Sequence, residues 1–408
     1  MRIAADDTIS RAPPAGSAFE VLQIFLKLGL TCFGGPVAHL GYFRDEFVTR
    51  RRWLDEHAYT ELVGLCQFLP GPASSQLGFA IGLMRARLPG ALAAWAGFTL
   101  PSAIALTAFA LGAHRLGGAA GNGVLHGLKL VAVAIVAQAV WGMARTLCPD
   151  RQRAGIAVLA MLAILFSGAS LAQLGVILFG GLAGLALCRG LPPAPLGHLA
   201  MPLSRGVGGF ALAAFFILLL GLPLAQRVTG SHALALFDAF YRSGALVFGG
   251  GHVVLPLLRD AIVTPGWMSD SDFLAGYGAA QAVPGPLFTF AAYLGALVKP
   301  VPHGLAGAAL GLAGIFLPGM LILLGVLPFW DALRRRPGAQ AAMRGVNAAV
   351  VGILGAALYN PVWTSAVTDS ADFGLAALGF VLLTSWRAPP LLVVLLCALG
   401  GGALALAG

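Results

Sequence analysis

Long apolar blocks follow one another along almost the whole chain, separated by short polar or proline-bearing links. They cover roughly residues 19–40, 58–84, 90–112, 123–147, 154–168, 170–188 and 207–225, and they continue through the second half. Unbroken runs such as Leu391–Leu396 lack the two-residue alternation of a transmembrane β-strand. At about 20 residues per crossing, the blocks predict about 12 or 13 transmembrane helices. The expected fold class is therefore an all-α integral membrane protein.

The small number of charged residues strengthens this prediction. Of the 408 residues, 58% are hydrophobic and 10% are charged, and the mean hydropathy is +0.86. Soluble proteins carry about 25% charged residues, so this chain has too few charged residues to form the surface of a soluble fold. The net charge of +9 then indicates basic cytoplasmic loops rather than a nucleic-acid partner. The five cysteines are scattered without metal-ligand spacing, so no metal site is expected.

One motif interrupts the apolar pattern in two places. The skeleton Gln-x-x-Pro-Gly-Pro occurs as Gln67, Pro70, Gly71 and Pro72, and again as Gln281, Pro284, Gly285 and Pro286. Proline lacks a backbone donor and clashes with the preceding helical turn, so each copy predicts a broken helix. Broken helices at membrane depth are tolerated only against protein or a water-filled cavity. A matched pair of them in two halves of a chain points to a transport site.

Other landmarks recur in the same order as the motif, which indicates an internal duplication. Trp53 precedes Gln67 by the same distance as Trp267 precedes Gln281. The remaining pairs are Phe33-Gly34-Gly35 with Phe248-Gly249-Gly250, Arg44 with Arg259, Pro101 with Pro318, and Lys129 with Asn347, in near-constant register.

The duplication sets the expected domain organisation. Residues 1–17 form a polar cytoplasmic tail without the apolar segment of a signal peptide, and 18–190 form the first transmembrane repeat. Residues 191–206 form a proline-rich linker, and 207–408 form the second repeat, with an extra span at 207–225.

The extra span predicts that the two repeats are inverted, provided that every apolar block crosses the membrane. The Lys/Arg bias of the loops then places the N-terminus in the cytoplasm. Arg44 and Arg50–Arg52 are exceptions, since they would lie on the side opposite to Arg85. A re-entrant first Pro-Gly-Pro segment removes this conflict, but it places Arg334–Arg336 on the side opposite to the cytoplasm. We therefore expect full crossings.

The polar residues inside the apolar blocks are mainly cationic or amide-bearing. Arg44, Lys129 and Arg259 are candidates to attract an anion, and Asn347 replaces Lys129 in the second repeat. The alternatives are local ion pairs for the arginines and a helix-end position for Lys129. Few acids lie in the spans, which argues against a metal-cation carrier.

The Pro-Gly-Pro copies suggest a more specific anion site. A helix that restarts after the break presents free N–H groups and the positive end of its dipole, and such a terminus binds anions. Gln67 and Gln281 could add donors, as could the hydroxyls that follow: Ser74, Ser75 and Thr289. For the two Phe-Gly-Gly turns (Phe33, Gly34, Gly35 and Phe248, Gly249, Gly250) we expect a hinge or close-packing role.

In their order and spacing, these landmarks resemble the chromate transporter (CHR) family. The resemblance rests on the Phe-Gly-Gly turns, Trp53, Trp267 and the two Gln-x-x-Pro-Gly-Pro copies, and it covers both halves, as in the long-chain, two-domain members. It implies a multi-pass protein of the bacterial inner membrane that exports chromate as a secondary transporter, without a cofactor, and confers chromate resistance.

Three alternatives to chromate export remain to be weighed. Chromate and sulfate are near-isosteric dianions, so a transporter of sulfate or another oxyanion stays open, as does a passive anion channel. An enzyme is not expected, because the chain has no nucleotide-binding motif and no nucleophile elbow. The expected partners are an oxyanion and the lipid bilayer, with a homodimer as an open arrangement.

Overall fold

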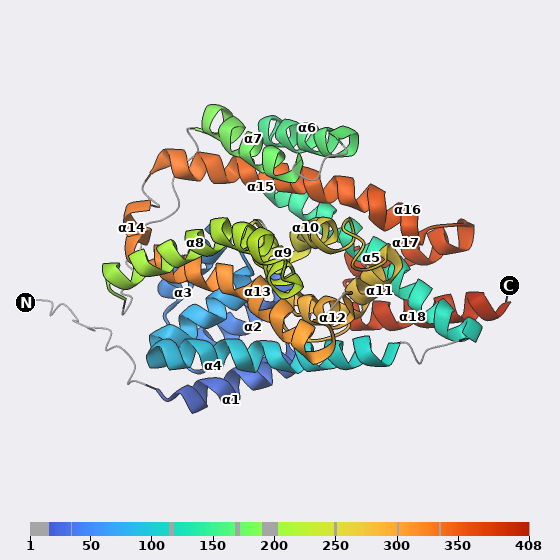
Figure 1. Cartoon of the computed structure of the whole chain (residues 1–408), viewed down its shortest axis with the longest axis horizontal. Helices are drawn as coiled ribbons and strands as arrows, with labels where there is room; N and C mark the ends of the chain where they lie inside the picture. Colours follow the sequence, from blue (N-terminus) through green and yellow to red (C-terminus); the bar gives the residue numbers. More distant parts are fainter. Residues whose placement is uncertain are drawn as a thin grey trace, which may run out of the picture.

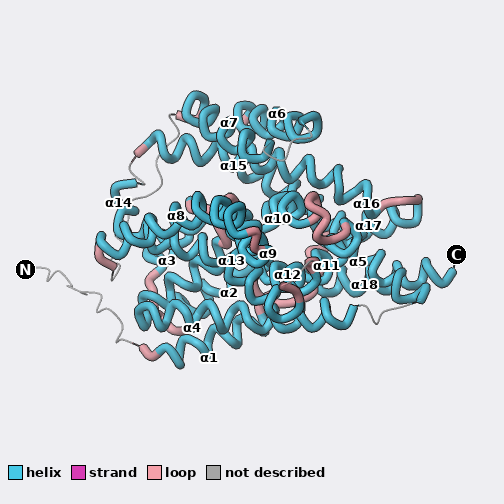
Figure 2. The backbone as a smooth tube through the Cα atoms, in the orientation of Figure 1, coloured by secondary structure: helices cyan, strands magenta, loops and turns pink. Residues whose placement is uncertain are grey.

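The computed structural model describes residues 16–33, 35–113, 118–167, 172–189, 203–248, 251–299, 302–333 and 336–407. Within these ranges the chain forms helices and turns and no β-strand, which confirms the all-α class (Figures 1 and 2). Most of the predicted tail and linker, namely 1–15 and 191–202, lies outside the described residues.

Eighteen α-helices make up most of the described residues. In chain order they are α1 (Ala18–Thr31), α2 (Gly35–Arg44), α3 (Glu56–Phe68), α4 (Ala73–Ala113), α5 (Gly118–Leu147), α6 (Arg151–Ser167), α7 (Ala172–Leu187), α8 (Arg205–Thr229), α9 (His232–Ala245), α10 (Val254–Ile262), α11 (Asp270–Ala280), α12 (Phe290–Leu297), α13 (Gly304–Val326), α14 (Trp330–Leu333), α15 (Pro337–Ala357), α16 (Thr364–Ala366), α17 (Ser370–Thr384) and α18 (Pro390–Ala407).

Five of the described segments are long and apolar enough to cross a membrane. They are Ala73–Gly112, Gly121–Leu147, Arg205–Thr229, Gly304–Phe329 and Pro337–Ala366. Four further apolar helices are shorter, among them Pro390–Leu406. These segments support a multi-pass membrane protein. The expected total of about 12 or 13 crossings counts each apolar block as one crossing.

The first apolar block, 19–40, is a helical hairpin rather than the expected full crossing. The Ser17 hydroxyl starts α1 by accepting the Glu20 N–H at 3.1 Å. Phe25 of α1 packs on Phe43 of α2, with ring centroids 5.5 Å apart. On one continuous helix, the 18 positions between them would span about 27 Å. The chain therefore turns back at Cys32, and the expectation of a single crossing here is wrong.

The second apolar block, 58–84, also turns back, so that its last residues lie beside its first ones. The Arg85 guanidinium lies 4.7 Å from the centre of the Trp53 ring, and Arg51 lies 5.9 Å from the same centre. Arg85 also pairs with Glu20 at the start of α1 at 3.1 Å. The expected separation of Arg51 and Arg85 on opposite sides is therefore wrong, because both cations contact one indole.

The bounds of α4 enclose a chain reversal. Ala86 and Arg87 have non-helical backbone angles, and a Cβ added to Gly82 would lie 2.4 Å from the Gly90 oxygen and 2.8 Å from the Ala94 Cβ. Residues 12 positions apart on a straight helix are about 18 Å apart. We therefore treat α4 as two antiparallel segments, 73–85 and 88–113.

The second repeat builds the same two hairpins. The Lys299 N–H, after α12, donates to the Trp267 carbonyl, before α11, at 3.1 Å. Equivalent glycines also make equivalent contacts: Gly29 of α1 packs against the second segment of α4, and Gly244 of α9 packs against α13. Small residues allow such close approach of helices. The shared contacts match the duplication read from the sequence.

Four helical hairpins thus hold the two Pro-Gly-Pro turns and the residues that pair with them. Hairpin 1 is α1–α2, hairpin 2 is α3 with the first segment of α4, hairpin 3 is α9–α10, and hairpin 4 is α11–α12. Their helices have 14 residues or fewer, or about 21 Å, which is shorter than a hydrocarbon core of about 30 Å. We call their turns apex 1 (Cys32 and Phe33), apex 2 (69–72), apex 3 (246–248) and apex 4 (281–286).

Candidate functional site

The four apices meet in two crossed pairs, each of which joins one repeat to the other. The Gly71 N–H of apex 2 donates to the Val247 carbonyl of apex 3 at 2.7 Å. The Gly285 N–H of apex 4 donates to the Cys32 carbonyl of apex 1 at 2.8 Å. Cys32 and Val247 each stand directly before the phenylalanine of a Phe-Gly-Gly turn. The two bonds are therefore the same contact made twice with the repeats exchanged.

Glycine is required at the centre of both Pro-Gly-Pro turns. Gly71 has φ +118° and Gly285 has φ +91°, a region that side chains disfavour. A Cβ on Gly71 would also lie 2.9 Å from the Gly319 Cα, and one on Gly285 would lie 2.9 Å from the Phe98 oxygen. Since the flanking prolines have no N–H, the glycine supplies the only backbone donor of each Pro-Gly-Pro, and both donors are engaged.

Side chains also hold the carbonyls of the two turns. Gln76 Nε2 donates to the Pro70 oxygen and to the Gly319 oxygen of α13, both at 2.9 Å. In the second repeat, the Ser102 hydroxyl donates to the Pro284 oxygen. These bonds fasten each apex to a long helix, α13 for apex 2 and α4 for apex 4.

Backbone donors remain at the start of α4. The first helical bond there runs from the Gln76 N–H to the Pro72 oxygen at 2.8 Å. The preceding amides, of Ala73, Ser74 and Ser75, belong to the first turn, which has no intrahelical acceptor for them. In apex 4 the Thr289 N–H and hydroxyl both donate to the Pro286 oxygen, so this hydroxyl is already used.

Buried polar side chains are concentrated near the apices. Among the described residues, seven of the twelve buried polar or charged side chains lie there: His39, Ser74, Ser75, Gln76, Thr99, Ser102 and Thr289. Buried polar atoms normally have a partner. Ser75 Oγ and Thr99 Oγ1 have none, and neither do Trp95 Nε1 and Gln281 Nε2.

His39 links these groups across the hairpins. The ring is fully buried on α2, and its Nδ1 lies 3.3 Å from the Ser74 hydroxyl. It packs edge-to-face on Phe98, with ring centroids 5.1 Å apart. Nε2 has no partner at hydrogen-bonding geometry, and the Cys32 carbonyl is the backbone acceptor that acts on the ring.

The two glutamines of the motif differ in position. Gln67 is exposed on α3, whereas Gln281 is partly buried at the end of α11. Only Gln281 points a buried amide nitrogen inward. The donor that contacts apex 2 is Gln76 instead, which lies nine positions further along the chain.

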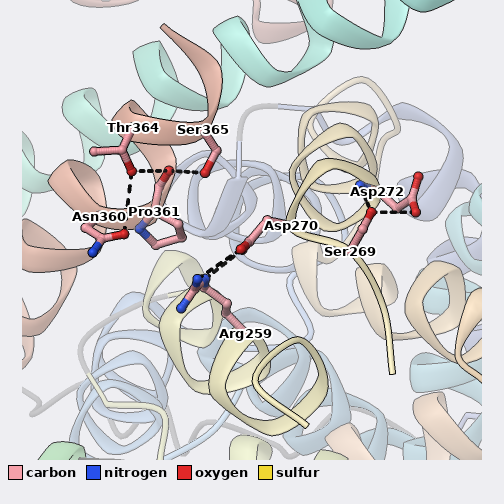
Figure 3. Close-up of polar contacts among 8 residues, drawn as sticks. All are labelled: Arg259, Ser269, Asp270, Asp272, Asn360, Pro361, Thr364 and Ser365. Carbon is pink, nitrogen blue, oxygen red and sulfur yellow. Dashed lines mark hydrogen bonds and ion pairs between the residues drawn. The ribbon is translucent and has the colours of Figure 1, made fainter. Parts of the chain in front are cut away.

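Arg44 and Arg259 occupy equivalent ion pairs at the bases of the hairpins, away from the apices. Arg44 Nε pairs with Glu56 at 2.7 Å, and Arg259 Nε pairs with Asp270 at 2.7 Å (Figure 3). The hydrogen bond from Arg44 lowers the pKa of Glu56 below its ordinary value. The partner is the first acid of the next hairpin rather than the acid adjacent in sequence.

Lys129 and Asn347 lie on helices that pack beside the hairpins: α5 contacts α11, and α15 contacts the short helix Gly251–Val253 after apex 3. Lys129 of α5 is half-buried, and the carboxylates of Asp272 and Asp372 act on its charge. Asn347 lies on α15, which contacts α10, and its Oδ1 is buried without a partner.

The Phe-Gly-Gly turns are described in part. Phe33 and Phe248 are half-buried at apices 1 and 3, and Gly35 has φ +76° at the start of α2. Gly34, Gly249 and Gly250 lie outside the described residues, so their hinge role stays a prediction. Among the residues that the structure describes, no three His, Cys, Asp or Glu side chains gather to hold a metal ion.

Five residues near the apices were not predicted from the sequence as site residues: His39, Gln76, Trp95, Thr99 and Ser102. Each is a polar or indole side chain in an otherwise apolar block, and that isolation is the signal that could have revealed them.

Comparison with known proteins gives the same two-part division. The family model described as "Chromate transporter" matches residues 19–185 and again 234–402. The chromate transport protein of Pseudomonas aeruginosa is 30% identical over 97% of this chain and 94% of its own length. The probable chromate transport protein of Synechococcus elongatus is 27% identical over 97% of this chain and 98% of its own. No solved structure matches the chain.

Proposed function

The chain belongs to the chromate transporter family, and from this premise we propose that it carries chromate across the bacterial inner membrane as a secondary transporter. In this proposal it exports the anion from the cytoplasm and confers chromate resistance. The observation that carries the proposal is the crossed pairing of the four apices. Each repeat places one of its broken-helix turns against the other repeat. The length of the short hairpin helices limits how deep these turns lie in the membrane.

We further infer that the repeats are inverted. The Tyr293 ring of hairpin 4 stacks on Phe109 at 5.8 Å, while its hydroxyl donates to the Asp272 carbonyl at the base of that hairpin. Phe109 lies about 33 Å along the second segment of α4 from Arg87, which adjoins the base of hairpin 2. The hairpin bases of the two repeats therefore adjoin opposite ends of one long helix, which supports inversion.

The anion site is proposed at the apices, with Gln281, Pro70, Gly71, Pro72, Pro284, Gly285 and Pro286 building it. Arg44 and Arg259 are proposed to attract the oxyanion toward the hairpin bases. Lys129, Gln67 and Asn347 remain candidates. Sulfate is the alternative substrate, because it has the same charge and tetrahedral shape.

Chromate accumulation in a chromate-sensitive bacterial host tests the function directly. Cells that produce the protein in their membrane should hold less chromate and tolerate more of it than cells that carry an empty vector. Equal accumulation at verified membrane expression would refute export. In proteoliposomes, saturable flux driven by an opposing gradient would separate a carrier from a passive channel.

A further inference from the structure

The segments that surround the paired apices carry no charge. Residues 28–40, 64–80, 244–256 and 277–291 contain no Asp, Glu, Lys or Arg, and neither do residues 88–102 of α4 after the arginine at its turn. The nearest ionised pair on these hairpins is Asp238 with Arg242, where Arg242 Nε lies 2.8 and 3.0 Å from the two carboxylate oxygens. That carboxylate is occupied by its own helix neighbour. On these segments, an anion at the apices would therefore meet neutral groups.

The first turn of α4 supplies donors that point to such an anion. Its free amides and the positive end of the helix dipole favour negative charge. The Ser75 hydroxyl lies in the same turn, is 4% exposed, and has no partner. A buried hydroxyl without a partner costs free energy, and a bound oxyanion would remove that cost.

A second set of donors lies on one face of the second segment of α4. Trp95, Thr99 and Ser102 are spaced by four and three positions, which places them on the same side of the helix. This side of the helix faces apex 4, because the Ser102 hydroxyl donates to the Pro284 oxygen. Thr99 is fully buried, and its hydroxyl has no partner.

His39 connects the two sets. Its ring contacts the Ser74 hydroxyl in the first turn of α4 and the Phe98 ring beside Thr99. The Phe98 carbonyl in turn lies against Gly285 of apex 4. His39 therefore lies between the two segments of α4 that carry the unpartnered hydroxyls, in contact with the residue that precedes Ser75 and with the residue that precedes Thr99.

We propose that these uncharged donors bind the transported oxyanion in its fully deprotonated form: the α4 first-turn amides, Ser75 and Thr99, with His39 as the positioning residue. This inference rests on the proposed function and names the chemical class of its substrate. The class is the tetrahedral dianion without a proton, such as chromate, sulfate or selenate. Neutral donors bind such an ion without the strong retention of a buried cation, which a transporter must avoid.

The same donor set discriminates against oxyanions that keep a proton. Phosphate and arsenate carry at least one O–H at neutral pH, and that donor needs an acceptor when it is desolvated. The apex segments offer no carboxylate for it. Gln76 Oε1 is an unpartnered acceptor in the first turns of α4, but a neutral amide oxygen accepts more weakly than a carboxylate.

Competition in proteoliposomes tests this selectivity on the unmodified protein. Uptake of chromate is measured against added sulfate, selenate, phosphate or arsenate at pH 7 and constant ionic strength. Sulfate and selenate should compete, and phosphate and arsenate should compete at least about tenfold more weakly. Phosphate that competes within about threefold of sulfate would overturn the inference.

Variants in α4 test the residues. Thr99→Val and Ser75→Ala should each raise the apparent KM for chromate about tenfold, which is the effect of one lost hydrogen bond to a charged ligand. Thr99→Ser should restore the value. Thr107→Val is the matched control, because the Thr107 hydroxyl donates to the Ala103 carbonyl of its own helix at 2.7 Å. A KM in Thr99→Val equal to that in Thr107→Val would contradict the assignment.

Binding measurements separate this inference from the proposed function. Thermal stabilisation of the purified protein by sulfate or selenate needs no transport. If these ions stabilise the protein but chromate is not carried, the proposed function fails and the donor site stands. If chromate is carried but phosphate stabilises the protein as well as sulfate does, the donor site fails alone. If no oxyanion binds or is carried, both fail.

Discussion

Gly71 and Gly285 each combine a backbone angle and a contact that another residue could not supply. Both have positive φ, and both donate their only N–H to the opposite repeat. The prolines on either side remove competing donors. The Pro-Gly-Pro motif is thus a device that exposes one backbone donor at the tip of a helical hairpin.

Gly285→Ala and Gly71→Ala should each destabilise the protein and abolish most transport. The positive φ alone costs about 1–2 kcal/mol for a residue with a side chain, and the new Cβ would press on Phe98 or Gly319. Thermal unfolding of the purified protein and vesicle uptake measure the two effects. Gly230→Ala is the control, because Gly230 has φ +62° with nothing within 4 Å. If Gly285→Ala behaved like Gly230→Ala, the apex contact would have no structural importance.

Arg44→Gln and Arg259→Gln should weaken substrate capture without unfolding the protein. The Arg44 ion pair is exposed and the Arg259 ion pair is partly exposed, so each contributes little to stability, whereas their charges act on an approaching anion. We expect a rise of about two- to fivefold in apparent KM at low ionic strength, which shrinks as salt screens the charge. Uptake measured across a salt series checks this. Arg227→Gln, at the end of α8, should show no such salt dependence, and a salt-independent effect in Arg259→Gln would refute electrostatic capture.

At the scale of elements, the hairpins are held by contacts at their bases as well as at their apices. Arg85 is 13% exposed and joins hairpin 2 to hairpin 1 through Glu20 and the Trp53 ring. Arg44 joins the same two hairpins through an exposed pair with Glu56. The less exposed Arg85 contacts should contribute more to the free energy of unfolding than the Arg44–Glu56 pair, because water screens the exposed pair.

Arg85→Gln should therefore lower the free energy of unfolding by about 2 kcal/mol, since it removes charge-assisted hydrogen bonds and a cation–π contact. Thermal or denaturant unfolding in detergent measures the change. Arg44→Gln is the comparison and should be nearly neutral. An equal loss in both variants would mean that the base contacts are interchangeable.

The sequence predicted the duplication well and the hairpins poorly, for a physical reason. Repeated residues such as Trp53 and Trp267 keep their register without any knowledge of the fold. An apolar block of about 22 residues, however, suits either one crossing or two half-length helices. Tertiary contacts decide between them, such as Phe25 with Phe43 in the first block and Arg85 with Trp53 in the second.

The candidate site was predicted in part for a similar reason. Pro-Gly-Pro turns can be recognised in the sequence because their residues are incompatible with a helix. His39, Trp95 and Thr99 are compatible with one, so their role depends on which face of the helix meets the apices. That face is set by tertiary contacts such as Ser102 with Pro284, which the sequence alone does not contain.

At the scale of the whole molecule, hairpins in both repeats remove the charge conflict raised by the sequence. A re-entrant segment in one repeat alone would displace the arginines near 334–336. When both repeats turn back, α13 is followed by Trp330, the first residue of α14, which shares a core cluster with Trp53. Several arginines then stand at the ends of helices on the same side of the molecule: Arg50–Arg52, Arg85 and Arg336. We infer that this side is cytoplasmic.

Cysteine labelling checks that topology with a matched pair of residues. Thr49 and Thr264 are both exposed and stand in equivalent positions near the bases of hairpins 1 and 3. Thr49→Cys should react with a membrane-impermeant maleimide only from the cytoplasmic side, and Thr264→Cys only from the outside. The unsubstituted protein, with four of its five cysteines buried, gives the background. Labelling of both from one side would refute inversion.

The crossed bonds between the apices also bear on why both repeats are in one polypeptide. Each bond takes its glycine N–H from one half and its carbonyl from the other, so a single half has one donor and one acceptor left without partners. Two identical halves could complete the pair only by associating. Covalent linkage fixes a one-to-one ratio of the halves and lets them diverge, so that Gln76 serves one turn and Ser102 serves the other. The duplicated chain is, in this sense, a dimer whose two subunits can no longer separate and no longer need to be alike.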